Sequence, residues 1–343
     1  MLRVVSLFAG IGGMDLGSEG GFSFLDSRYR KLPARVVYAM DIDEAACDIY
    51  NANFSTACHI QDILDLDSHD VPDHDILTGG FPCQAFSIIA QNPKRLGYKD
   101  DRGKLFFEMC RILRDKQPLA FIAENVKGLL SANNGEAFPL VIDHFEDAGY
   151  HVTHGVLNAS HFGVPQKRER VFIVGFKDKS NLAAFRFPDP TTQNKPVVLR
   201  KVVMPEETVE AQYYFSDNAI KGLMRTKNKK SMNKGRIQDM DQPCNTVAAH
   251  LAKVSLNSTD PVLCENGRYR RFTPREVARI QSFPESFELS GTRGAVYRGL
   301  GNAVPPVVMW HLMSGVLSAL GKKASPNRQK TIAKKSGLAL EIS

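Results

Sequence analysis

The stretch VVSLFAGIGGMDLGSE, residues 4–19, decides the fold that we predict for this chain. Residues 4–8 form a short apolar run typical of a buried strand, and residues 14–19 have the pattern of a helix start. The turn between them is rich in glycine, which lets a ligand approach the backbone closely at a helix N-terminus. Its spacing is G-x-G-G, not the dinucleotide G-x-G-x-x-G, so a pyrophosphate is not required. A plain tight turn explains this pattern nearly as well.

The alternation of strands and helices continues beyond this turn. Together these patterns predict an α/β fold, a doubly wound and mostly parallel sheet with helices on both faces. We interpret residues 23–35 as a surface insertion. The predicted strands lie at residues 36–39, 59–60, 75–77, 120–123, 151–157 and 171–176, and the predicted helices at 44–53, 104–115 and 136–148.

A second, smaller domain is predicted where the alternation stops, near the sequence FPDP at 187–190. Helical periodicity returns at residues 304–320, behind two prolines that suit a helix start. We expect this helix to pack beside the first strand. The predicted organisation is a large domain at 1–185, an irregular small domain at 186–284, a return to the large domain at 285–320 and a basic, disordered tail at 321–343.

Composition and charge bound the class of protein. The chain has 343 residues, of which 43% are hydrophobic and 24% charged, as in ordinary globular proteins. We expect a cytoplasmic location, because the sequence lacks a signal-peptide pattern and an apolar run of about 20 residues. The net charge is +7, but the tail after Gly321 carries six basic residues against Glu341, which leaves +2 for the rest. A basic run at 221–236 is either a solvated loop or a phosphate-contacting surface.

One of the six cysteines stands apart. No C-x-x-C or zinc-site spacing occurs, so we predict no metal and interpret five cysteines as reduced, mostly buried thiols. Cys83 lies in GGFPCQAFS, residues 79–87, directly after a proline at the end of a predicted strand. This context is typical of a nucleophile that is held in the open. A free thiol is only a few per cent thiolate at pH 7, and the arginines of QKRER, residues 166–170, could activate it.

Acidic residues follow the neighbouring predicted strands. Asp41 follows the second strand, Asp62 the third, and Glu124 belongs to AENV at the end of the fifth. Because neighbouring strand ends converge on one crevice, we expect the acids and the glycine turn to form a nucleoside pocket. Cys83 and Glu124 would then face one substrate.

Six blocks of sequence, in this order, resemble the motif series of the DNA cytosine-C5 methyltransferases. They are FAGIGG, GGFPCQAFS, AENV, QKRER, RRFTPREVARIQSFP and GNAVPP, and the resemblance covers nearly everything except residues 186–262 and the tail. It implies that the Cys83 thiolate adds to cytosine C6 while Glu124 assists at N3. It also implies that Arg168 or Arg170 holds the cytosine O2, and that Gln166 orders its loop.

The resemblance further implies S-adenosyl-L-methionine as cofactor and S-adenosyl-L-homocysteine as product. Phe8 would pack on the adenine, Asp41 would bind the ribose and Asp62 the adenine amino group. Ile42 stands where relatives often have a large aromatic residue, so adenine stacking should be weaker on that side. The full predicted cofactor set is Phe8, Gly10, Ile11, Gly12, Gly13, Asp41, Ile42, Asp62, Ile63, Gly80, Pro82, Leu105, Asn302 and Ala303.

Double-stranded DNA is the implied substrate, and its target base must be flipped out of the duplex to be reached. Residues 84–103 suit a loop that closes over this base. The small domain would recognise the DNA sequence, with lysines on phosphates and arginines on bases. The predicted DNA contacts are Ser87, Gln166, Arg225, Lys227, Lys229, Lys230, Arg236 and Thr246.

Two rival hypotheses remain open. A tRNA cytosine methyltransferase of the same fold would carry a CFT tripeptide, which this sequence lacks. A catalytically inactive DNA-binding relative would have lost the cysteine or the glutamate, and both are present. We expect a monomer, and the sequence leaves open the recognition site and whether a cognate restriction endonuclease shares it.

Overall fold

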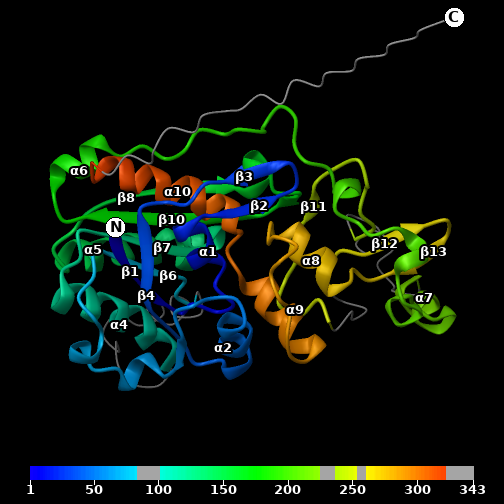
Figure 1. Cartoon of the computed structure of the whole chain (residues 1–343), viewed down its shortest axis with the longest axis horizontal. Helices are drawn as coiled ribbons and strands as arrows, with labels where there is room; N and C mark the ends of the chain where they lie inside the picture. Colours follow the sequence, from blue (N-terminus) through cyan, green and yellow to red (C-terminus); the bar gives the residue numbers. More distant parts are fainter. Residues whose placement is uncertain (83–100, 225–235, 253–259, 322–343) are drawn as a thin grey trace, which may run out of the picture.

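The centre of the molecule is a seven-stranded sheet in the order β5-β4-β1-β6-β7-β10-β8 (Figure 1). The computed structural model describes residues 1–82, 101–224, 236–252 and 260–321. β10 runs antiparallel to both of its neighbours, and the other ladders are parallel. The predicted α/β fold is therefore confirmed. The strands are β1 (Leu2–Leu7), β4 (Ala34–Asp41), β5 (Cys58–Ile60), β6 (Ile76–Gly79), β7 (Ala120–Val126), β8 (His151–Asn158) and β10 (Glu169–Phe176).

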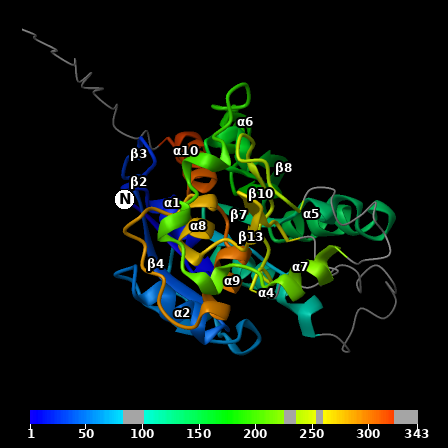
Figure 2. The same cartoon turned by 90° about the vertical axis from the view of Figure 1, so that its right-hand side faces the viewer.

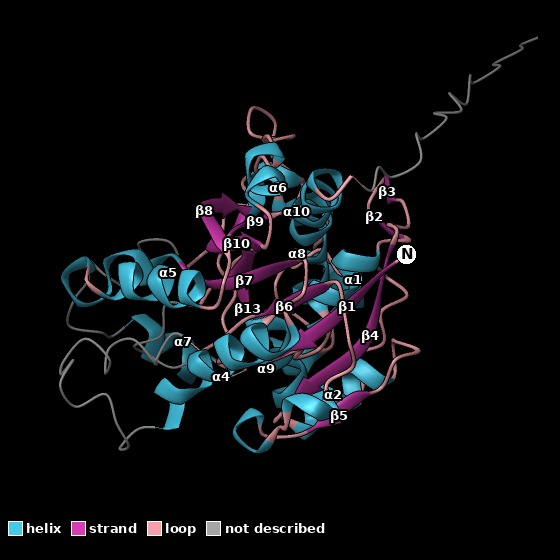
Figure 3. Ribbon diagram, turned by 90° about the vertical axis from the view of Figure 1, so that its left-hand side faces the viewer, coloured by secondary structure: helices cyan, strands magenta, loops and turns pink. Residues whose placement is uncertain are grey.

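Helices cover both faces of this sheet (Figure 3). Successive strand residues point to opposite faces, so Val4 joins one apolar cluster and Val5 the other. The first cluster lies beneath α1 (Gly13–Glu19), α2 (Glu44–Asn51) and α10 (Pro306–Ala319). The second lies beneath α4 (Asp101–Lys116) and α5 (Ala137–Asp147). Burial on both faces explains why these strands are apolar nearly throughout.

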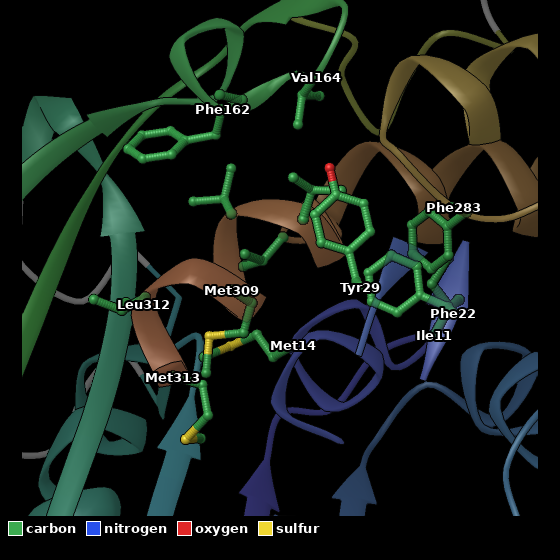
Figure 4. Packing of buried hydrophobic residues seen from close by; sticks show 14 of the residues in the cluster. Ile11, Met14, Phe22, Tyr29, Phe162, Val164, Phe283, Met309, Leu312 and Met313 are labelled. Carbon is green, nitrogen blue, oxygen red and sulfur yellow. The ribbon is translucent and has the colours of Figure 1, made fainter. Parts of the chain in front are cut away.

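The last helix returns to the beginning of the chain. α10 packs against α1 (Figure 4). Its buried side chains belong to the same apolar cluster as residues of the first strand. A Cβ atom at Gly17 would lie 2.5 Å from the carbonyl oxygen of Pro306, so only glycine permits this approach. The helix begins at Pro306 instead of residue 304, because α9 (Arg293–Asn302) ends immediately before an extended segment.

Residues 23–35 are not simply a surface insertion, which corrects our interpretation. β2 (Phe22–Phe24) and β3 (Ser27–Tyr29) form a hairpin whose aromatic side chains are buried. Phe22 stacks on Tyr29 (Figure 4). Tyr29 in turn meets the edge of Trp310 in α10. The indole Nε1 donates to the carbonyl of Arg30 at 2.9 Å. The hairpin buries its apolar side because α10 supplies a partner from the other end of the chain.

The remaining elements lie to one side of the sheet (Figures 1 and 2). They are α7 (Asp217–Met224), β12 (Leu263–Glu265), β13 (Arg268–Arg270), α8 (Pro274–Ile280) and α9. Arg270 and Glu276 form a fully buried ion pair here, with Nη1 2.9 Å from a carboxylate oxygen. β11 (Cys244–Asn245) pairs in parallel with β9 (Gln166–Lys167), which joins this part to the sheet region. α6 (Lys179–Ala184) lies between β10 and α7 in the sequence. Among the described helices, none combines the length and apolar character needed to span a membrane.

Candidate active site

Five parallel strands end at one edge of the sheet, and each contributes to one cavity of about 680 Å³. From β5 to β7, the cavity receives Asp62, Asp41, the turn after β1, Pro82 and Glu124. The parallel register of β6 and β7 pairs Gly79 with Ala123, which sets Gly80 beside Glu124. The expected convergence of strand ends is confirmed by this arrangement.

The cavity collects nearly the whole predicted cofactor set. The members that line it are Phe8, Gly10, Ile11, Gly13, Asp41, Ile42, Asp62, Ile63, Gly80, Pro82, Leu105, Asn302 and Ala303. Gly12 is absent from this lining in the described chain, and a Cβ there would overlap the rings of Phe54 and Tyr50. Its φ of 85° is left-handed, so this glycine serves the turn and the packing of α2. Prediction missed the lining residues Ala9, Met14, Met40, Asp43, Ala46, Gln61, Leu64, Gly299 and Val304, most of which adjoin predicted ones.

Asp41 holds the glycine-rich turn in place. One carboxylate oxygen accepts from the backbone N–H of Gly10 at 2.8 Å, and the other accepts from that of Asp43 at 2.9 Å. Burial raises the pKa of Asp41, and these two hydrogen bonds oppose the rise. A Cβ built on Gly10 meets nothing within 4 Å, so the turn presents open space to a ligand. Phe8 has a φ of 56°, a conformation that non-glycine residues adopt rarely.

Glu124 is a buried carboxyl at the same cavity. Its Oε1 lies 3.0 Å from Nε of Arg170, which comes from the antiparallel neighbour β10. Burial raises the pKa of Glu124, while the positive charges of Arg170 and Arg168 act in the opposite direction. A Cβ on Gly80 would lie 3.3 Å from Oε2, so the backbone before Pro82 passes close to this carboxyl.

Sequence reasoning assigned no role to Asn125, which follows Glu124 in the AENV block and is not among the residues that line the cavity. It is buried, and its Nδ2 donates to the carbonyl of Phe81 at 3.0 Å. This bond ties β7 to the segment that leads into Pro82. Cys83, the predicted nucleophile, and Ser87 lie outside the described residues.

Arg168 and Gln166 are buried inside the protein. The Arg168 guanidinium donates to the carbonyls of Val247 at 3.2 Å and Gly301 at 3.0 Å, and burial lowers its pKa to about 9. Gln166 donates to Oε1 of Gln281 at 2.7 Å and accepts from the N–H of Val247. Arg168 therefore joins the 244–247 segment to the end of α9, and Gln166 joins the same segment to the end of α8. The resemblance implied that Arg168 or Arg170 holds the cytosine O2, and that Gln166 orders its loop and contacts DNA. Here Arg168 and Gln166 both contact protein groups.

Only some of the predicted DNA contacts lie among the described residues. Arg225, Lys227, Lys229 and Lys230 lie outside the described residues. Arg236 is buried, with its Nε donating to the carbonyl of Asp260 at 3.2 Å, and burial lowers its pKa. The Thr246 hydroxyl donates to the carbonyl of Lys167 at 2.8 Å, which places it beside the end of β9. In the described part of the chain, His, Cys, Asp and Glu side chains form no group of three suited to a metal ion.

Comparisons with known proteins point in one direction. The sequence model of a family described as C-5 cytosine-specific DNA methylase matches residues 2–317. The Type II methyltransferase M.NgoBI of Neisseria gonorrhoeae is 38% identical over 310 residues, which cover 90% of this chain and 91% of the relative. M.NlaX of Neisseria lactamica is 36% identical over 332 residues, 94% and 99% of the two chains. The crystal structure of the S. pombe Dnmt2 methyltransferase superposes with a TM-score of 0.71 at 24% identity, covering 93% and 99%, which is a likeness of fold.

Proposed function

Since the chain belongs to the C-5 cytosine-specific DNA methylases, which transfer a methyl group to cytosine in DNA, we propose that S-adenosylmethionine is the donor. The acceptor would be C5 of a cytosine that is flipped out of a specific duplex sequence. The observation that carries this proposal is that Glu124 and the glycine-rich turn line the same cavity. A carboxyl for the base and a pocket for the cofactor therefore meet at one place.

The cavity fits the proposed cofactor in size and in chemistry. Its volume of about 680 Å³ is in the range of pockets for ligands of this size. Asp41 would accept hydrogen bonds from the ribose hydroxyls, and Asp62 would accept one from the adenine amino group. The open space at Gly10 leaves room for the methionine portion. When bound, the cofactor would supply an electrophilic methyl group.

Cys83 would add as a thiolate to C6 of the cytosine, and this addition makes C5 electron-rich. Glu124 would stabilise the adduct by donating a proton to N3, which its raised pKa favours. After methyl transfer, loss of the C5 proton to a base would form the C5–C6 double bond and break the C6–S bond, so that the Cys83 thiolate leaves and the N3 proton returns to Glu124. Asn125 would help to position the nucleophile through its bond to the Phe81 carbonyl.

The two arginines receive different roles in this proposal. Arg170 contacts Glu124, so we assign to it the orientation of the carboxyl and the contact with cytosine O2. Arg168 is buried among backbone carbonyls, so we now assign it a positioning role.

Residues 186–284 would form the target-recognition domain between the two parts of the catalytic domain, 1–185 and 285–320. Phosphate contacts would come from Lys227, Lys229 or Lys230. We extend the proposal to a restriction–modification system with a cognate endonuclease, supported by the relatives' name of Type II methyltransferase. The protein would act as a monomer.

The nucleophile can be tested by covalent trapping. Duplex DNA with 5-fluorocytosine at the target should accumulate a protein–DNA adduct in the presence of cofactor, because fluorine cannot leave as a proton does. Bisulfite sequencing of DNA from an expressing host would first identify the target. The adduct should vanish in Cys83→Ala, and an adduct that persists there would refute the assignment. tRNA in place of DNA serves as the substrate control.

A further inference from the structure

Two cysteines outside the proposed catalytic machinery touch one another. Cys47 lies in α2 and Cys58 in β5, and their sulfur atoms are 3.2 Å apart. Both are buried, at 0% and 5% exposure, and both are free thiols. Their separation of eleven positions in the sequence does not match a familiar cysteine motif, so only the packing of α2 on β5 reveals the pair.

The pair is held firmly beside the cofactor cavity. The Cys47 sulfur is 3.6 Å from the carbonyl oxygen of Asp41, and the N–H of Cys58 donates to Oδ1 of Asn51 at 2.7 Å. Ala46 and Gln61, close to the two cysteines in sequence, line the cavity. A change in the distance between α2 and β5 would therefore move two parts of its wall.

The two thiols differ in character. The hydrogen-bonded contact between the two sulfur atoms lowers the pKa of Cys47 and raises that of Cys58. Cys47 is thus the better nucleophile of the two. β5 is a three-residue strand at the edge of the sheet, with His59 and Ile60 exposed, so local opening at this edge gives a small oxidant access.

We propose that Cys47 and Cys58 form an oxidation site whose disulfide weakens cofactor binding. With a hydroperoxide as oxidant, the Cys47 thiolate attacks one peroxide oxygen, the O–O bond breaks, and Cys47 becomes a sulfenic acid. The Cys58 sulfur then attacks the Cys47 sulfur, the S–O bond breaks, and water leaves. Two thiols lose two electrons together, and hydrogen peroxide is reduced to two molecules of water.

The distance that must close sets the size of the effect. A disulfide has an S–S length of roughly 2.05 Å, so the sulfur atoms must approach by roughly 1 Å from their separation of 3.2 Å. This draws the first turns of α2 toward β5 and displaces Ala46 and the region of Asp41. We expect the Kd for S-adenosylhomocysteine to rise about tenfold, because a loss of only about 1.4 kcal/mol of binding free energy is enough for a change of this size. The expected effect on cofactor binding rests on the proposed function, whereas the formation of the disulfide does not.

The test uses the full chain with Cys83→Ser, so that the predicted nucleophile cannot react. After treatment with hydrogen peroxide, intact mass should fall by two hydrogens, and peptide mapping should join Cys47 to Cys58. Calorimetry with S-adenosylhomocysteine should give the weaker Kd after oxidation and the original Kd after reduction with dithiothreitol. Cys47→Ala and Cys58→Ala should each abolish the cross-link and the peroxide sensitivity of binding. Cys264→Ala, which removes a thiol elsewhere, should retain both.

The outcomes separate the two proposals. Reduced protein that does not bind S-adenosylhomocysteine contradicts the cofactor assignment and leaves the cross-link to be judged by mass alone. Protein that binds the cofactor product but forms no Cys47–Cys58 link under peroxide overturns the oxidation site. A link that forms while the Kd stays within twofold overturns its effect on binding.

Discussion

Asp41→Asn is the most informative single substitution in the proposed cofactor cavity. The carboxylate accepts two backbone N–H groups, from Gly10 at 2.8 Å and from Asp43 at 2.9 Å. An asparagine offers one acceptor oxygen and places an NH₂ group against the other N–H. One hydrogen bond to a charged group is then lost, which costs about 1.5–3 kcal/mol.

The free protein can relax the glycine-rich turn away from the unpaired N–H, and the cofactor must restore the turn when it binds. The loss therefore appears in the binding equilibrium. At 1.4 kcal/mol per decade, the Kd for S-adenosylhomocysteine should rise by about 10- to 100-fold. The ribose hydroxyls would also face a neutral acceptor instead of a charged one, which acts in the same direction.

Isothermal titration calorimetry measures this Kd, and urea denaturation measures the free energy of unfolding of the same protein. Asp48→Asn is the matched control, because Asp48 is exposed within α2, the helix that follows Asp41, and the substitution makes the same change of charge. It should leave both quantities unchanged. An Asp41→Asn protein whose Kd lies within threefold of wild type, with unaltered stability, would refute the reasoning.

Three further substitutions test the remaining electrostatics. Glu124→Gln should keep the Kd for S-adenosylhomocysteine within twofold and lower the rate of methyl transfer by about 10²- to 10⁴-fold; a near-normal rate would place proton donation elsewhere. Burial raises the pKa of Asp15 to about 7, so the folded state binds the extra proton and the free energy of unfolding falls as pH rises from about 4 to 7. Asp15→Asn should flatten that fall, by up to about 4 kcal/mol in denaturation curves, and an unchanged pH profile would contradict the assignment. Arg270→Met leaves Glu276 buried without its partner and should lower the free energy of unfolding by about 3–5 kcal/mol. Arg268 is exposed, so Arg268→Met should lower the free energy of unfolding by less than about 1 kcal/mol. Equal effects of the two substitutions would contradict this reasoning.

The layout of the cavity to which we assign the cofactor was predictable from the sequence. Periodicity located the strands of the parallel sheet, and residues at or just after their ends were predicted to line one pocket. This succeeds because parallel strands joined by helices all end at the same edge of a sheet, so position along the chain becomes position at the cavity. The sequence alone therefore predicted that Asp41, Asp62 and Glu124 lie at one cavity.

The burial of individual polar residues was decided by tertiary structure alone. Arginine and glutamine side chains are usually found on the surface or in contact with a substrate. Arg168 and Gln166 are nevertheless buried, against the 244–247 segment and against partners near α8 and α9. Asn125 binds the Phe81 carbonyl just beyond the neighbouring strand β6, and this bond is the basis of its proposed positioning role. The physical reason is that the environment of a side chain depends on which distant backbone groups face it.

The hairpin and the cysteine pair, unlike the sequence motifs, also depend on tertiary contacts. β2 and β3 appeared to be a surface insertion until α10, nearly 280 residues later, supplied Trp310 as a partner. Cys47 and Cys58 carry no motif, and their contact exists because α2 packs on β5. Local sequence determines the dihedral preferences and periodicity that build elements, and these have a short range. Which elements bury one another depends on the folding of the whole chain, so these contacts could be learned only from the tertiary structure.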